Sequence, residues 1–260
     1  MITTCILLGV ALSCMLLTPR ILGRGTWRIR HPELCLTLWY SSFGVGAACT
    51  LVGTVNAVVI GVRLRMAADL EGWVIPTVEW VGAWAVLTVA GGASCYVVGK
   101  VAVLVATERR IRTDFALLTA QAKERMRLLG GLTVHIVESQ ETLVCSLRRG
   151  PGEIIISRGV ADSLDADSLS AVFAHERAHL RGLHDIATRL AAFNSACFPH
   201  GRAQRALSRD THLLIELAAD RAAARTVGRP SMIRALESLA TVVTADAHTL
   251  RLRASLLSDP

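Results

Sequence analysis

The sequence lacks any Cys-x-x-Cys pair, although it contains seven cysteines. Cysteine inside an apolar run behaves as a small hydrophobic residue, and five of the seven occupy such runs: Cys5, Cys14, Cys35, Cys49 and Cys95. Neither a disulfide framework nor a cysteine zinc site is therefore expected. The chain also lacks internal repeats and low-complexity tracts, which excludes a repeat architecture.

Lysine is scarce, since Lys100 and Lys123 are the only two, and arginine supplies nearly all the positive charge behind the net charge of +7. A basic balance can indicate nucleic-acid binding. Here, however, the arginines flank apolar segments, which is typical of membrane proteins. We expect no direct nucleic-acid partner.

Hydrophobic residues make up 52% of the chain, and its mean hydropathy is +0.45. Three apolar stretches cover residues 2–17, 34–62 and 78–107. The second and third are long enough to span about 30 Å of hydrocarbon. The first lacks the positively charged start of a signal peptide, which favours a retained span. A lipid bilayer is therefore the first expected partner.

Arginines predict the orientation of these spans, because cytoplasmic loops of membrane proteins are enriched in Lys and Arg. They gather between the first two spans and directly after the third: Arg20, Arg24, Arg28, Arg30, Arg109, Arg110 and Arg112. The loop between spans two and three offsets its arginines with Asp69 and Glu71. We predict a multi-pass protein of the cell (inner) membrane with its N-terminus outside and a cytoplasmic catalytic domain.

The chain after the third span predicts a mainly helical domain with a small sheet. An amphipathic helix is expected over residues 108–129, and strands over residues 132–137, 142–147 and 153–157. Further helices are expected over residues 185–198, 203–226 and 231–257. The predicted domains are therefore a transmembrane region of three helices, residues 1–107, and an α+β domain, residues 108–260.

One further helix carries the motif His175-Glu-Arg-Ala-His179 and is expected to begin after Asp165 as N-cap and to end near Gly182. Residues four apart share a helix face, so both histidines can bind one metal ion. Glu176 can still reach a water on that metal, as the general base of a zinc hydrolase does. The motif predicts Zn²⁺ as cofactor.

A catalytic zinc usually has three protein ligands, and the spacing leaves the third one open. Asp185 stands where a metzincin-like motif has its third ligand, but no methionine follows in a suitable turn. Glu216 is the other candidate, with Asp220 one helical turn later to hold a ligand histidine. His212, one turn before Glu216, is a rival ligand.

Several segments together resemble the membrane-embedded gluzincins of the BlaR/MecR antirepressor peptidase family, which is related to HtpX-type and CAAX-processing peptidases. They are Ile156-Ser-Arg-Gly159, the helix start at Asp165, Ala174-His-Glu-Arg-Ala-His-Leu180, His184-Asp185, Phe198-Pro199 and Glu216-Leu-Ala-Ala-Asp220. The resemblance implies a zincin-like domain in which His175, His179 and Glu216 bind zinc and Glu176 is the catalytic base. It implies supporting roles for Asp220 and Asp185.

The expected function is limited proteolysis at the cytoplasmic face by a zinc endopeptidase, with a transcriptional repressor as substrate by analogy. A membrane-protein quality-control protease is the alternative. A non-proteolytic zinc-binding signalling protein is a third hypothesis, against which Glu176 argues. Members of the family that sense β-lactams carry a penicillin-binding domain with a Ser-x-x-Lys nucleophile. The chain has no such motif, so antibiotic sensing is not expected.

Overall fold

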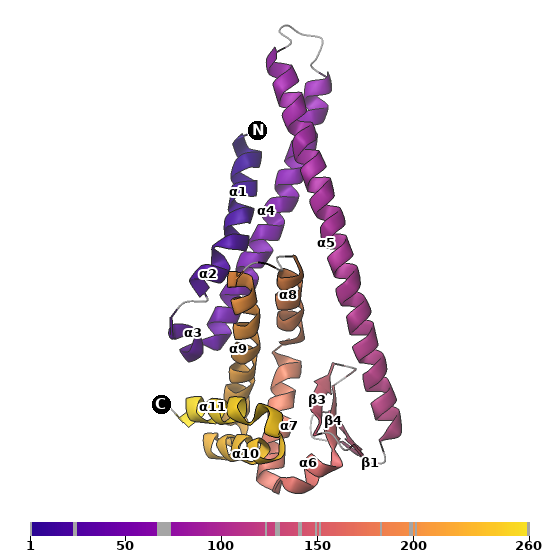
Figure 1. The fold of residues 1–260 in the computed structure, drawn as a ribbon, viewed down its shortest axis with the longest axis vertical. Helices are drawn as coiled ribbons and strands as arrows, with labels where there is room; N and C mark the ends of the chain where they lie inside the picture. Colours follow the sequence, from indigo (N-terminus) through magenta and orange to yellow (C-terminus); the bar gives the residue numbers. More distant parts are fainter. Residues whose placement is uncertain are drawn as a thin grey trace. The chain divides into compact units, whose positions relative to one another are not determined.

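The computed structural model describes residues 2–22, 25–66, 74–122, 124–127, 131–139, 142–148, 150, 152–182, 184–197, 200 and 202–258 (Figure 1). The chain forms two compact units, one of residues 1–104 with 191–210 and one of residues 105–190 with 211–260. The predicted division into residues 1–107 and 108–260 differs from these units at residues 105–107, which belong to the second unit, and at residues 191–210, which belong to the first.

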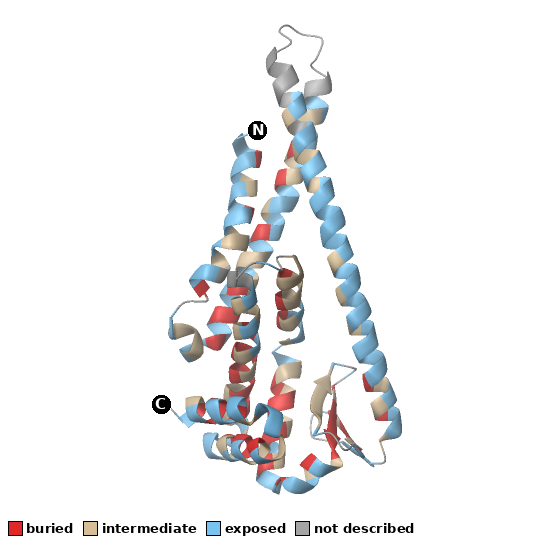
Figure 2. Cartoon of the chain, in the orientation of Figure 1, coloured by how far each residue is buried: buried red, intermediate tan, exposed pale blue. Residues whose placement is uncertain are grey.

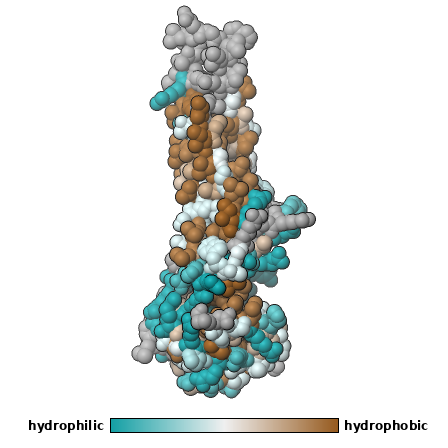
Figure 3. Space-filling model, turned by 90° about the vertical axis from the view of Figure 1, so that its left-hand side faces the viewer, coloured by the Kyte–Doolittle hydropathy of each residue, from teal (hydrophilic) through white to brown (hydrophobic). Residues whose placement is uncertain are grey.

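The first unit is built from long apolar helices. Its elements are α1 (Ile2–Leu16), α2 (Thr18–Leu22), α3 (Trp27–Arg30), α4 (Pro32–Met66) and the first part of α5 (Val74–Gln121). Among the described residues, three helical stretches are long and apolar enough to cross a membrane: Ile2–Leu22, Pro32–Arg63 and Trp80–Gln121. Their side chains are largely exposed (Figure 2), and hydrophobic atoms cover this part of the surface in Figure 3. These helices suggest a membrane-associated protein. Asp69 and Glu71 lie outside the described residues.

Helices α1 and α4 approach each other closely because small residues line their contact. A Cβ on Gly53 would lie 3.4 Å from side-chain atoms of Leu7 and Leu8. Asn56 Nδ2 donates a hydrogen bond to Thr4 Oγ1 over 2.8 Å, which joins the two helices away from water. Small residues and polar links of this kind are typical of helix pairs in membranes.

A four-stranded sheet lies in the second unit, with strand order β1-β2-β4-β3. Its strands are β1 (Glu124–Arg127), β2 (Thr133–Val137), β3 (Val144–Leu147) and β4 (Glu153–Ser157). Strands β2 and β4 are parallel, while β1 pairs with β2, and β3 with β4, antiparallel. The three predicted strands are confirmed, and β3 lies at one edge of the sheet.

The predicted helix over residues 108–129 is wrong at both ends. Helix α5 continues without a break from the apolar stretch to Gln121, and Glu124–Arg127 then forms β1. All four residues of β1 are exposed, so no hydrophobic alternation indicates a strand. Pairing with β2, which follows directly in the chain, satisfies backbone groups of both strands and outweighs the helix propensity of Glu-Arg-Met-Arg.

Both faces of the sheet are covered by helices of the second unit. One face packs against α7 and α10 through a core of aliphatic side chains that includes Val134, Ile154, Ile156, Val172, Met232 and Leu236. The other face places Val137 and Ile155 against Phe115 of α5. This packing fixes β3 beside α7, the helix that carries the His-Glu-x-x-His motif.

The helices after the sheet are α6 (Arg158–Ser163), α7 (Ala166–Arg181), α8 (His184–Cys197), α9 (Arg202–Val227), α10 (Arg229–Val242) and α11 (Ala247–Ser258). Asp165 caps α7 by accepting a hydrogen bond from the Ser168 backbone N–H over 2.6 Å, and Gly182 follows its last turn, as predicted. Phe198 and Pro199 lie outside the described residues.

The segment of residues 231–257 is helical, as predicted, but a short 3-10 turn at Thr244–Asp246 divides it into α10 and α11. The β-branched run from Val242 to Thr244 weakens the helix there, since such residues lose side-chain freedom in a helix. The break lets α11 fold back onto α10, and the two pack closely.

Candidate functional site

Helices α7 and α9 bring two imidazoles and a carboxylate together. The four-residue spacing places His175 and His179 on one face of α7, with their Nε2 atoms 2.9 Å apart. Glu216 reaches them from α9, with Oε2 3.3 Å from His175 Nε2 and Oε1 3.5 Å from His179 Nε2. Among the described residues, these three form the group close enough to share one metal ion, with ligand atoms within 4.8 Å of one another.

The chemistry of this donor set fits zinc. Catalytic zinc is commonly bound by imidazole nitrogen and carboxylate oxygen from three side chains, which leaves one position open. The three groups lie in the wall of a cleft, so a water molecule or substrate can reach that position. His175, His179 and Glu216 thus form a candidate His-His-Glu zinc site.

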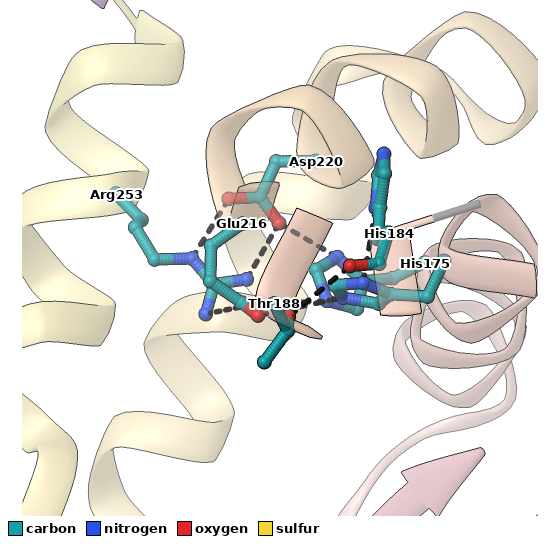
Figure 4. Close-up of polar contacts among 7 residues, drawn as sticks. His175, His184, Thr188, Glu216, Asp220 and Arg253 are labelled. Atoms are coloured by element: carbon teal, nitrogen blue, oxygen red, sulfur yellow. Dashed lines mark hydrogen bonds and ion pairs between the residues drawn. The ribbon is translucent and has the colours of Figure 1, made fainter. Parts of the chain in front are cut away.

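A buried ion-pair network holds two of the acidic groups around His175 (Figure 4). Asp220 is fully buried, and its Oδ1 lies 2.9 Å from His175 Nδ1, on the side of the ring opposite Glu216. Arg253 extends from α11 and donates from Nε and Nη2 to the two oxygens of Asp220 over 2.8 and 2.7 Å. Its Nη1 lies 2.8 Å from Glu216 Oε2. One guanidinium therefore fixes both carboxylates.

The sequence analysis missed Arg253. It belongs to no motif and lies 37 residues after Glu216, in a segment predicted only to be helical. The one available signal was the pair of acidic residues, because two carboxylates on one buried face need a cation.

The network moves the pKa values of its members in opposite directions. Burial alone would lower the pKa of His175, but the hydrogen bonds to Asp220 and Glu216 outweigh it and raise this pKa to about 9. Burial and the neighbouring His175 lower the pKa of His179 to about 4. Burial would raise the pKa of Glu216 and of Asp220, but His175 and Arg253 lower both. The carboxylates are therefore ionised at neutral pH.

Glu176 lies beside this group and is buried. Burial raises the pKa of its carboxyl, which the positive charge of His175 and a hydrogen bond from the Ser146 side chain partly oppose. Ser146 belongs to edge strand β3, so the sheet directly contacts the carboxylate that is the predicted base. A carboxylate with a raised pKa is a stronger proton acceptor than an exposed one.

A cleft of about 820 Å³ contains the site within the second unit. Strand β3 lines one wall with Val144–Leu147, and His175, Glu176, His179 and Glu216 line another. Aliphatic side chains of α10 and α11 extend the cleft on the side of Arg253. It is large enough for several residues of an extended peptide.

The other candidate ligands occupy different places. Asp185 pairs with Arg189 one turn later on α8, over 3.3 Å, and is more exposed than the three clustered groups. His212 is exposed on α9 and lines the cleft one turn before Glu216. His184 contacts His179 instead, with their Nδ1 atoms 3.1 Å apart.

Residues 146–210 match peptidase family M48. The matched segment includes His175, Glu176 and His179 and ends before Glu216. No curated protein and no solved structure matches the chain. Peptidases of family M48 are typically zinc-dependent. The matched segment therefore supports a zinc metallopeptidase family, and with it a metalloprotease function for this protein.

Proposed function

We propose that this protein is a membrane zinc endopeptidase that makes limited cuts in proteins at the cytoplasmic face of the cell membrane. The main support for this proposal is that His175, His179 and Glu216 lie close together beside the buried carboxylate of Glu176. Three ligands and a base in one cleft are the side chains that zinc binding and the activation of a water molecule require. The match to family M48 over residues 146–210 supports it independently.

In this proposal His175, His179 and Glu216 hold the zinc ion. A zinc ion there would supply Lewis-acid chemistry, polarising the scissile carbonyl and a water molecule. The Glu176 carboxylate takes a proton from the attacking water and passes it to the nitrogen of the leaving amine. Arg253 and Asp220 hold Glu216 and His175 in place, so the ligands need no rearrangement when substrate arrives.

Edge strand β3 aligns the substrate. Within the described residues β3 pairs on one side only, with β4, and its residues line the cleft. An extended peptide that pairs with the other side of β3 would lie across the site, its backbone held by hydrogen bonds and its alternate side chains directed into the cleft. Such binding favours unfolded or extended segments over folded domains.

The charge of α5 supports the proposed orientation in the membrane. Exposed arginines occur on α5 directly after its apolar part, at Arg109, Arg110 and Arg112, and suit an anionic cytoplasmic membrane surface. The N-terminus would then lie outside. A cysteine at Asp69 should react with an impermeant reagent added from outside, and one at Arg202 should not. The opposite labelling would place the catalytic unit outside.

Replacement of the base tests the activity. Glu176→Gln keeps the size of the side chain and removes its basicity, so the purified full chain should retain zinc and lose cleavage of a peptide library. His248→Ala, an exposed histidine of α11, should keep both. Equal zinc loss in Glu176→Gln would show that Glu176 is a ligand and not the base.

The resemblance to BlaR/MecR peptidases supports a transcriptional repressor as substrate, with membrane-protein quality control as the second candidate. Proteomes of cells that express the wild type or Glu176→Gln distinguish the two. A regulatory protease should change the abundance of one or a few cytoplasmic proteins. A broad rise in fragments of membrane proteins with the wild type would contradict the repressor hypothesis.

A further inference from the structure

The ring of His184 lies against the outer side of His179. His184 begins α8, and Thr188 Oγ1 donates a hydrogen bond to its backbone carbonyl over 3.1 Å. The two imidazoles meet edge to face, with ring centroids 5.0 Å apart and planes at 85°. Their Nδ1 atoms are 3.1 Å apart, which is hydrogen-bond distance.

The position of His179 in the site decides which nitrogen donates. Its Nε2 faces His175 and Glu216, so this is the atom that a metal ion would use. A neutral imidazole has one N–H and one lone pair, and a free lone pair on Nε2 requires the proton on Nδ1. His179 Nδ1–H then donates, and His184 Nδ1 accepts.

Gly182 makes the room for this contact. A Cβ at Gly182 would lie 2.3 Å from His184 Nε2 and 2.7 Å from its Cδ2, which no side chain tolerates. The backbone of Gly182 is ordinary, with φ −73° and ψ 0°, so its conformation does not require glycine. The His184 ring therefore occupies, at the end of α7, the space that a side chain at residue 182 would fill.

We propose that His184 is a positioning residue that fixes the tautomer and the ring orientation of His179, and that Gly182 serves it by providing space. The inference rests on the zinc site proposed above. His175 has the corresponding support from Asp220, so each ligand histidine has a partner on its outer nitrogen. The neutral imidazole of His184 suits His179 better as a partner than a carboxylate would, because a third carboxylate would add negative charge beside Glu216 and Asp220.

Two variants of His184 separate positioning from packing. Asn can place its amide oxygen where His184 Nδ1 lies, whereas Ala removes the acceptor. His184→Ala should weaken zinc binding about 10- to 100-fold, measured by chelator competition on the purified full chain. His184→Asn should bind zinc within about threefold of the wild type, the margin expected when the hydrogen bond is kept. Gly182→Ala should weaken binding as His184→Ala does, and His248→Ala should not.

Imidazole nitrogen NMR shifts of metal-free protein labelled with ¹⁵N-histidine give a second readout that needs neither zinc nor activity. His179 should carry its proton on Nδ1 in the wild type and in His184→Asn, and shift toward the Nε2–H form in His184→Ala. A wild type with the proton on Nε2, or equal zinc affinity of His184→Ala and wild type, would overturn the inference. A wild type that binds no zinc would contradict the proposed function, while the nitrogen assignment still decides the role of His184.

Discussion

Removal of the Arg253 side chain should damage both the stability and the metal site. Asp220 is fully buried, and Arg253→Ala deletes two of its hydrogen bonds and the contact to Glu216. Breaking a buried ion pair from one side costs about 3–5 kcal/mol, since the remaining charge has lost its partner. For domains of this size 1 kcal/mol shifts the melting temperature by about 2–4 °C, so a fall of roughly 6–20 °C is expected.

Zinc affinity should fall in the same variant by about 10- to 100-fold, because Glu216 loses the donor that holds its carboxylate. Thermal unfolding of the purified full chain, followed by circular dichroism, measures the first effect, and chelator competition measures the second. Arg251→Ala is the matched control, since Arg251 is exposed on the same helix. It should stay within about 0.5 kcal/mol of the wild type.

A double-mutant cycle tests the pairing itself. Replacing both partners, as in Arg253→Met with Asp220→Leu, removes the charges together and should recover much of the stability lost in either single variant. If Arg253→Ala melts with the wild type and binds zinc equally well, the buried network does not hold the site, and the reasoning from its distances is refuted.

Three further outcomes are expected. Glu216→Ala should lose stoichiometric zinc in metal analysis while Asp185→Ala keeps it, and the reverse would identify Asp185 as the third ligand. Zinc affinity should rise about tenfold per pH unit up to about pH 9, because His175, with its pKa of about 9, must lose a proton to bind metal; calorimetry in buffers of different ionisation enthalpy counts that proton. Gly152→Ala should destabilise the protein by about 1–3 kcal/mol in chemical denaturation, since its φ is +118° and a Cβ would lie 2.5 Å from a leucine methyl group. Gly159→Ala, which has no heavy atom within 4 Å, should cause no loss.

The features that the sequence predicted correctly depend on neighbours in the chain. The spacing of His175 and His179 fixes their common face, and Asp165 satisfies the start of its own helix. Strands β2 and β4 are each rich in valine or isoleucine. Such patterns are local, so one sequence is enough to detect them.

The features that it did not predict depend on contacts that arise only in the folded chain. Strand β1 has only exposed residues and forms because its backbone pairs with the edge of β2. Arg253 resembles any other arginine on a helix until α11 folds back and places it against Asp220. His184 entered the sequence analysis only as part of the segment His184-Asp185, and its contact with His179 requires the space at Gly182, which no spacing rule indicates.

The distance in sequence between Glu216 and Arg253 affects how the protein is made. On the ribosome, both histidines and Glu216 leave the exit tunnel before Arg253, which follows Glu216 by 37 residues. In that interval Glu216 and Asp220 have no guanidinium beside them, so the contacts from Arg253 cannot yet fix the two carboxylates. The two carboxylates beside His175 are therefore held by Arg253 only once α11 has docked.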